Sequence, residues 1–154
     1  MPTLEPAGPV AACSVFPPVE LLHRETHPVT LVAHFTVGGN PIPKARARAD
    51  PRTGRHYTPL ETKVAEHRVV WALRAAGVRG PCDPTSLFGV HTVFRCATNR
   101  HADGDNMLKL VLDALNGVVW RDDSQVVEKS VVVHRGVGAA RSHTEAVIYK
   151  IEGR

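Results

Sequence analysis

The sequence predicts an α+β fold in which a small mixed β-sheet packs against two helices. Three observations carry this prediction. Strand-like apolar segments lie in both halves of the chain, two segments have a helical pattern, and both kinds of element occur within one domain-sized length. The 154 residues suit a single domain, and 43% of them are hydrophobic, so a core can form without disulfide or metal staples.

The N-terminal segment differs in composition from the rest of the chain. The first 28 residues hold six of the twelve prolines. We therefore predict an extended, Pro-rich arm over residues 1–28 and a single folded domain over residues 29–154. The first strand is expected over 29–37, where apolar residues alternate, and Gly38, Gly39 and Pro41 end it.

A hairpin and a helix are expected next. Two short alternating stretches flank the turn sequence Asp50-Pro51-Arg52-Thr53-Gly54, which favours a hairpin. Thr58 and Pro59 then predict a helix start, with Thr58 as the N-cap and Pro59 in the first turn. The helix is expected over 60–76, because Gly77 is a typical helix end. Its apolar side is predicted to carry Val64, Trp71, Ala72 and Ala75.

The second half of the chain contains three predicted strands and one predicted helix. A strand is expected over 87–97 and a helix over 105–115, closed by Asn116-Gly117. The last two strands are expected over 125–134 and 144–151, with a Gly-Val-Gly turn between them.

Cysteine usage and hydropathy restrict the class of protein. Cys13, Cys82 and Cys96 are far apart, odd in number and outside any C-x-x-C spacing, so neither a disulfide framework nor a cysteine zinc site is expected. This pattern favours a reducing cytoplasm. No apolar run approaches the length of a membrane span, so no membrane partner is expected. The motifs G-x-S-x-G and H-E-x-x-H are both absent, which argues against two common kinds of hydrolase.

The basic residues are concentrated in the predicted hairpin. The net charge of +4 favours a polyanionic partner only weakly. Five cations lie within twelve residues, opposed locally only by Asp50: Lys44, Arg46, Arg48, Arg52 and Arg55. Alternate strand positions would place Lys44, Arg46 and Arg48 on one face, where they could bind DNA phosphates without reading base sequence. A solvated, charged loop is the alternative interpretation.

Four acidic residues flank the second predicted helix. Asp103 and Asp105 precede it, and an extended segment would direct both side chains to one side. Asp122 and Asp123 follow it, and the returning chain could bring them to the first pair. Convergent carboxylates repel one another unless a cation lies between them, and oxygen ligands favour Mg²⁺, with Mn²⁺ as the alternative. The simpler interpretations are helix capping at the first pair and a solvated turn at the second.

Lys109 lies four residues after Asp105 and four before Asp113, so these three side chains share one helix face. They could form a surface ion-pair ladder, worth roughly a few tenths of a kcal/mol per pair. In the second interpretation, the Lys109 ammonium lies beside the metal site and stabilises charge on a scissile phosphate.

Two long motifs resemble the RusA family of Holliday junction resolvases, the crossover junction endodeoxyribonucleases of phage and prophage type. The first motif is Gly39-Asn-Pro41-Ile-Pro43-Lys44-x-Arg46-x-Arg48, followed by Tyr57-Thr58-Pro59. The second is Asp103-x-Asp105-Asn106-x-x-Lys109-x-x-x-Asp113-Ala-Leu-Asn116-Gly117, followed by Trp120-x-Asp122-Asp123-x-Gln125-Val126. The likeness extends from about Val29 to the C-terminus. It departs from the family pattern at Gly104, where an apolar residue is common, and at Ala45 and Ala47.

This resemblance implies a Mg²⁺-dependent endonuclease that resolves Holliday junctions by paired symmetric nicks in DNA recombination and repair. Its catalytic residues would be Asp103, Asp105, Asp123 and Lys109. Its metal ligands would be Asp103, Asp105 and Asp123, with Asp122 as a less critical member.

The resemblance also implies a homodimer. A dimer with two-fold symmetry would place two equal sites on a four-way junction. The apolar runs 118–120 and 131–133 could supply part of its interface, although burial in the core is the default expectation for both. Two alternatives stay open: a branched-DNA-binding protein without catalysis, and a nuclease that acts on flaps or forks.

Overall fold

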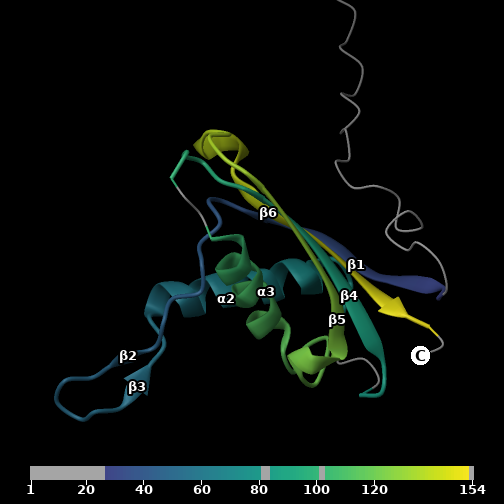
Figure 1. Cartoon of the computed structure of the whole chain (residues 1–154), viewed down its shortest axis with the longest axis horizontal. Helices are drawn as coiled ribbons and strands as arrows, with labels where there is room; N and C mark the ends of the chain where they lie inside the picture. The colour runs from purple at the N-terminus through teal and green to yellow at the C-terminus, as the bar shows by residue number, and fades with distance from the viewer. Residues whose placement is uncertain (1–26, 81–83, 101–102, 153–154) are drawn as a thin grey trace, which may run out of the picture.

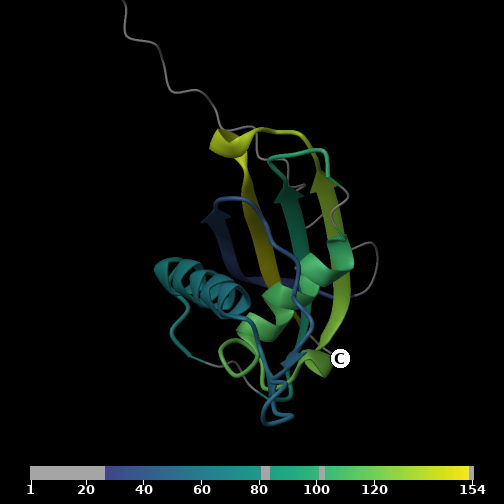
Figure 2. The same ribbon diagram turned by 90° about the vertical axis from the view of Figure 1, so that its left-hand side faces the viewer.

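A computed structural model describes residues 27–80, 84–100 and 103–152 of the chain (Figure 1). Two helices cover one face of a four-stranded mixed sheet, and a short two-stranded ribbon projects from the helical side (Figures 1 and 2). The predicted α+β fold is therefore confirmed. The predicted arm over residues 1–28 lies outside the described residues, apart from His27 and Pro28.

The four-stranded sheet is mixed, and its first and last strands in the chain lie side by side. Its strands are β1 (Val29–Gly38), β4 (Leu87–Arg95), β5 (Val126–His134) and β6 (His143–Ile151), in the order β1-β6-β4-β5. β6 is antiparallel to both of its neighbours, whereas β4 and β5 are parallel. A parallel pair needs a long crossover connection, and helix α3 (Gly104–Leu115) lies within the one between β4 and β5.

The predicted hairpin is present as a ribbon of β2 (Arg48–Ala49) and β3 (His56–Tyr57). Its turn is closed by two backbone hydrogen bonds of 2.8 Å, from the Asp50 N–H to the Arg55 carbonyl and from the Gly54 N–H to the Asp50 carbonyl. Gly54 has a φ of +66°, which glycine adopts without steric cost. The ribbon extends away from the sheet (Figure 1).

Helix α2 (Leu60–Ala75) has the predicted extent, but two details of its prediction are wrong. Its N-cap residue is Pro59 and no side chain caps it, so Thr58 is not the cap. Its buried residues are Thr62, Val69 and Leu73, whereas Val64 and Trp71 are 51% and 78% exposed. Apolar residues lie on both sides of this helix, so their periodicity did not identify the face that packs on the sheet.

Helix α3 and the turn after it form the centre of the core. Seven of the twelve α3 residues are buried, and the helix ends at Asn116 with Gly117 at a φ of +72°. Val119 and Trp120 are fully buried, and the Trp120 ring packs against Phe88 with ring centroids 5.7 Å apart. Val119 and Trp120 are therefore core, which is the default interpretation of this run.

The structure bears on two further expectations, those about cysteine pairing and about membrane spans. Cys96 is a free, buried thiol, while Cys13 and Cys82 lie outside the described residues. Neither α2 nor α3 has the length and apolarity that a membrane-crossing helix requires.

Candidate active site

Asp105 and Asp123 line the same open groove, which lies between α3 and β5 and has a volume of about 470 Å³. Asp105 is in the first turn of α3, and Asp123 begins the short 3-10 turn η1 (Asp123–Gln125) that leads into β5. The crossover between two parallel strands thus returns the chain and brings these carboxylates to one groove. The other lining residues are Leu108, Lys109, Leu112, Lys129 and Val131.

Asp103 caps α3. Its Oδ1 accepts the backbone N–H groups of Asp105 at 3.1 Å and Asn106 at 3.2 Å, and its Oδ2 accepts the Asn106 side-chain amide at 2.6 Å. These bonds satisfy N–H groups that have no partner inside the helix. Asp103 is not a lining residue of the groove, and its cap fixes the first turn that carries Asp105.

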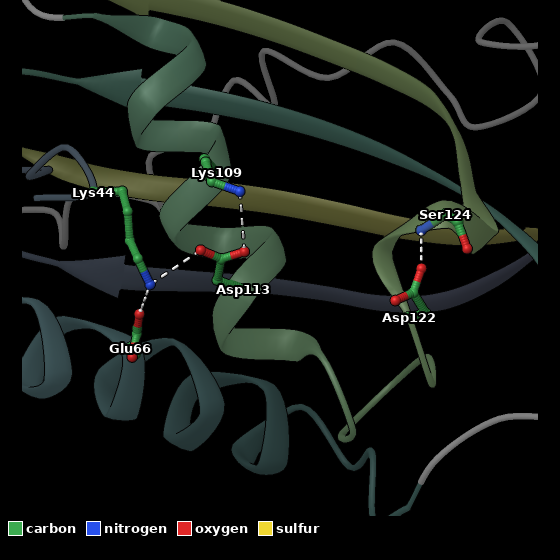
Figure 3. Close-up of polar contacts among 6 residues, drawn as sticks. All are labelled: Lys44, Glu66, Lys109, Asp113, Asp122 and Ser124. Atoms are coloured by element: carbon green, nitrogen blue, oxygen red, sulfur yellow. Dashed lines mark hydrogen bonds and ion pairs between the residues drawn. The ribbon is translucent and has the colours of Figure 1, made fainter. Parts of the chain in front are cut away.

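Asp122 has the same local role one element later. Its Oδ1 accepts the Ser124 N–H at 2.9 Å (Figure 3), and hydrogen bonds from Ser124 hold the pKa of the Asp122 carboxyl below its ordinary value. Gln125 closes the cap, because its side-chain oxygen accepts the Asp122 N–H at 3.3 Å while its amide donates to the Ser86 carbonyl at 2.9 Å. The turn that carries Asp123 is thereby fixed to the start of β4.

Gly104 allows α3 to approach β5 closely. A Cβ at this position would lie 3.0 Å from the Val131 Cγ1 and 3.2 Å from the Val133 Cγ2, closer than side chains normally pack. The departure from the family pattern at this position therefore has a structural account. With glycine at position 104, the turn that carries Asp105 packs directly against the strand that carries Lys129.

Two lysines share the groove with the carboxylates. The Lys109 side chain is 57% exposed and lines the groove. Its Nζ lies 3.5 Å from the Asp113 Oδ1 (Figure 3), so the predicted ion pair with Asp113 is present. Lys129 was missed at the sequence level. Strand alternation places Lys129 on the same side of β5 as Val131 and Val133, which face α3. A lysine in line with these core-facing valines was the sequence feature that could have identified it as a site residue.

Lys44 lies in an ion-pair cluster between the two helices. Its Nζ contacts Glu66 of α2 and lies 3.0 Å from the Asp113 Oδ2 of α3 (Figure 3). Burial lowers the pKa of the Lys44 ammonium, but its bonds to Glu66 and Asp113 more than offset this and raise the pKa overall. The Lys44 N–H also donates to the Asn106 carbonyl at 2.9 Å. Lys44 therefore joins α2 to α3 and is not presented on an exposed face.

Replacing Lys44 by alanine is expected to lower the free energy of unfolding by about 2 kcal/mol, because it removes the cation that pairs with the partly desolvated Glu66 carboxylate and leaves Lys109 as the remaining cation beside Asp113. The side chains of Lys44, Glu66 and Asp113 are only 21%, 22% and 21% exposed. Urea denaturation followed by circular dichroism measures the change. Lys150→Ala is the control, because its more exposed pair with Glu152 is worth at most about 1 kcal/mol. Equal losses in both variants would contradict this role of the cluster.

The other four predicted DNA-binding residues are all exposed. Arg48 lies in β2, Arg46 precedes it, and Arg52 and Arg55 lie in the turn and its return. The base of the ribbon adjoins the first turn of α3 through the Lys44 bond to Asn106. The ribbon that carries these arginines lies on the helical side of the sheet (Figure 2), and the groove between α3 and β5 lies on that side too.

The carboxylate oxygens of the groove are donor atoms of the kind that Mg²⁺ prefers. In the described ranges, no group of three or more His, Cys, Asp or Glu side chains is arranged to hold a metal ion. Mg²⁺ is, however, usually bound through one or two carboxylates, with water and substrate phosphate as its other ligands. Two carboxylates without a thiol or imidazole beside them, as in this groove, fit that arrangement.

Comparison with known proteins agrees with the motifs. A family model described as Endodeoxyribonuclease RusA matches residues 38–145, well over half of the chain. The matched range includes the ribbon, both groove carboxylates and both groove lysines. A search of curated proteins finds no match.

Proposed function

The chain belongs to the RusA endodeoxyribonuclease family, and we propose that it is a Mg²⁺-dependent enzyme that resolves Holliday junctions by paired symmetric nicks. The observation that carries the proposal is the groove in which Asp105 and Asp123 lie with two lysines. Such a combination suits phosphodiester hydrolysis, because carboxylates can hold a hard cation while ammonium groups attract the phosphate.

In this proposal each groove residue has a stated task. Asp105 and Asp123 would hold Mg²⁺, with Mn²⁺ as a substitute; when bound, the ion supplies Lewis-acid polarisation of the phosphate and lowers the pKa of a water. Lys109 and Lys129 would attract the non-bridging oxygens and stabilise the negative charge that develops on them. Attack by water in line with the 3′ oxygen breaks the P–O3′ bond and leaves a 5′ phosphate and a 3′ hydroxyl.

Asp103 and Asp122 act through the elements that they cap. Each keeps one carboxylate oxygen on backbone N–H groups and thereby fixes the turn that carries a groove carboxylate. If Asp103 is a third ligand of the metal ion, it would bind through its Oδ2, which accepts a hydrogen bond from the Asn106 side-chain amide in this structure. Asp122 would contribute less to the ion than Asp123, since Asp123 lines the groove.

The exposed ribbon arginines would bind the phosphates of the junction arms. Arg46, Arg48, Arg52 and Arg55 are solvent-exposed, and phosphate contacts position DNA without specifying its sequence. Lys44 contributes to this surface indirectly, by fastening the base of the ribbon to α3.

The active form would be a homodimer that uses the β5 edge. β5 forms one edge of the sheet, and its Val127 and Val132 side chains are 43% and 37% exposed. The edge strand of one subunit can pair with the same strand of a second subunit related by two-fold symmetry. β5 also lines the groove, so this pairing would lie next to it. Such a dimer would present two equal grooves to a substrate that needs two symmetric cuts. Of the run 131–133, only Val132 would take part in this interface, because Val131 and Val133 pack on the helical side of β5.

Cleavage of a labelled four-way junction tests the proposal. The full chain is incubated with the junction or with a linear duplex of the same arm sequence, in Mg²⁺ or in EDTA. Paired symmetric nicks in the junction alone, lost in EDTA, are expected. Tight junction binding without nicks in Mg²⁺ or Mn²⁺ would instead support a binding protein, and faster cutting of flaps or forks would assign another branched substrate.

A further inference from the structure

The outer side of α2 carries an exposed tryptophan that the groove does not use. Trp71 is 78% exposed, and Leu60 and Val64 on the same helix are 75% and 51% exposed. The spacings i, i+4 and i+11 place these three side chains in one stripe, opposite the buried residues of α2. A tryptophan in water adds nothing to the core and favours a helix less than alanine does, so the packing of the described chain does not account for it.

Exposed basic residues flank this stripe, and the lysine and the two arginines among them carry a positive charge. Helical geometry places Lys63, His67 and Arg74 along one flank, and the row extends about 16 Å from Lys63 to Arg74. Arg68 lies on the other flank. The stripe and these four residues are called the α2 platform below. Of the two glutamates of α2, Glu66 bonds Lys44 and Glu61 is the one that is exposed, so the platform is predominantly basic.

A shallow hollow adjoins the indole ring. It has a volume of about 500 Å³, and Trp71, Val64 and His67 of α2 line it together with Thr36, Val37 and Gly38 of β1. Arg68 also lines it and donates to the Gly38 carbonyl, which fixes the guanidinium between the helix and the strand. The platform thus combines a flat aromatic face, an apolar hollow and a row of cations.

We propose that the α2 platform binds single-stranded DNA, with a base stacked on Trp71 and the backbone following the row of cations. The proposal rests on the proposed function, which supplies DNA as the substrate. Cations beside an exposed aromatic ring are the usual means of holding a strand without sequence preference. A duplex does not fit as well, because its base faces are already stacked on one another.

Charge argues against a second copy of the chain as the occupant. When two copies of a helix pack antiparallel about a two-fold axis, each flank meets the same flank of its mate. Lys63 and Arg74 of this row would then face the same two residues of the mate, and like charges at an interface oppose association. A polyanionic strand meets the same row with opposite charge.

The test measures binding of a fluorescein-labelled twelve-nucleotide oligo(dT) to the full chain in EDTA at fixed salt, by anisotropy. Trp71→Ala is expected to weaken binding about tenfold, the loss typical of one stacked base, whereas Trp71→Phe stays within about twofold of wild type. Leu60→Ala is the matched control, because Leu60 is as exposed as Trp71 but has no aromatic face. Removing Lys63 and Arg74 together should reduce the salt slope by about 1.4.

Intrinsic fluorescence supplies a second readout. Trp120 is fully buried, so quenching of indole emission by oligo(dT) reports Trp71, and it should disappear in Trp71→Phe. Wild-type affinity in Trp71→Ala would overturn the proposal. So would an equal loss in Leu60→Ala, or a fall from dimer to monomer by sedimentation in Trp71→Ala, since each indicates an apolar protein interface. Trp71-dependent binding without junction cleavage would contradict only the proposed function, and cleavage without Trp71-dependent binding only this inference.

Discussion

Asp105→Asn is expected to slow junction cleavage about a thousandfold, because a bound ion supplies several kcal/mol to the transition state and each ~1.4 kcal/mol is tenfold in rate. Asparagine keeps the size of the side chain but is a far weaker ligand for a hard cation. Single-turnover cleavage of a labelled four-way junction in Mg²⁺ measures the rate.

Junction binding by Asp105→Asn should be unchanged or slightly tighter, because the substitution removes a negative charge from a groove that receives phosphate. The fold should also persist. Asp105 is exposed and follows the capping residue, so its loss costs only about 0.5 kcal/mol of favourable interaction with the helix dipole. An Asp105→Asn protein that cuts at the wild-type rate would remove Asp105 from the active site.

The adjacent acids Asp122 and Asp123 are expected to behave differently. Asp123→Asn should slow cleavage by about a thousandfold, as for Asp105, since Asp123 lines the groove. Asp122→Asn should stay within about tenfold of wild type, because asparagine is as good an N-cap as aspartate and keeps the bond from the Ser124 N–H. The two variants carry the same chemical change at neighbouring positions, so each is the control for the other.

This comparison separates metal binding from turn geometry. Equal losses in both variants would mean that the acidic pair acts as a unit, and a larger loss in Asp122→Asn would reverse the assignment. The same cleavage assay serves, with thermal unfolding to confirm that each variant is folded.

Local sequence patterns were sufficient for most elements of the fold. Period-two alternation identified the first strand and the hairpin, and apolar runs identified the others. Asn116-Gly117 marked the end of α3, because only a few residues accept the φ of +72° found at Gly117. The acids before and after α3 were expected to approach one another because the chain can return after a helix of this length, and Asp105 and Asp123 do line one groove. These features depend on short-range geometry.

Features that depend on tertiary contacts were not predicted. The inner face of α2 could not be chosen, because Val64 and Trp71 are as apolar as the buried Val69 and Leu73. Lys44 shares its spacing with Arg46 and Arg48, but its partners Glu66 and Asp113 are distant in sequence and meet it only in the fold. The capping role of Asp103 was weighed at the sequence level, and the structure shows it.

The central claim is that Asp105 and Asp123 serve one metal ion in one groove. Single-turnover cleavage by the double variant Asp105→Asn/Asp123→Asn tests this claim most directly, beside the two single variants. If both residues hold the same ion, losing either removes its contribution, and the double variant should cleave within about threefold of the slower single variant. Losses that multiply, leaving the double variant about a thousandfold slower than either single variant, would show two independent sites and contradict the account.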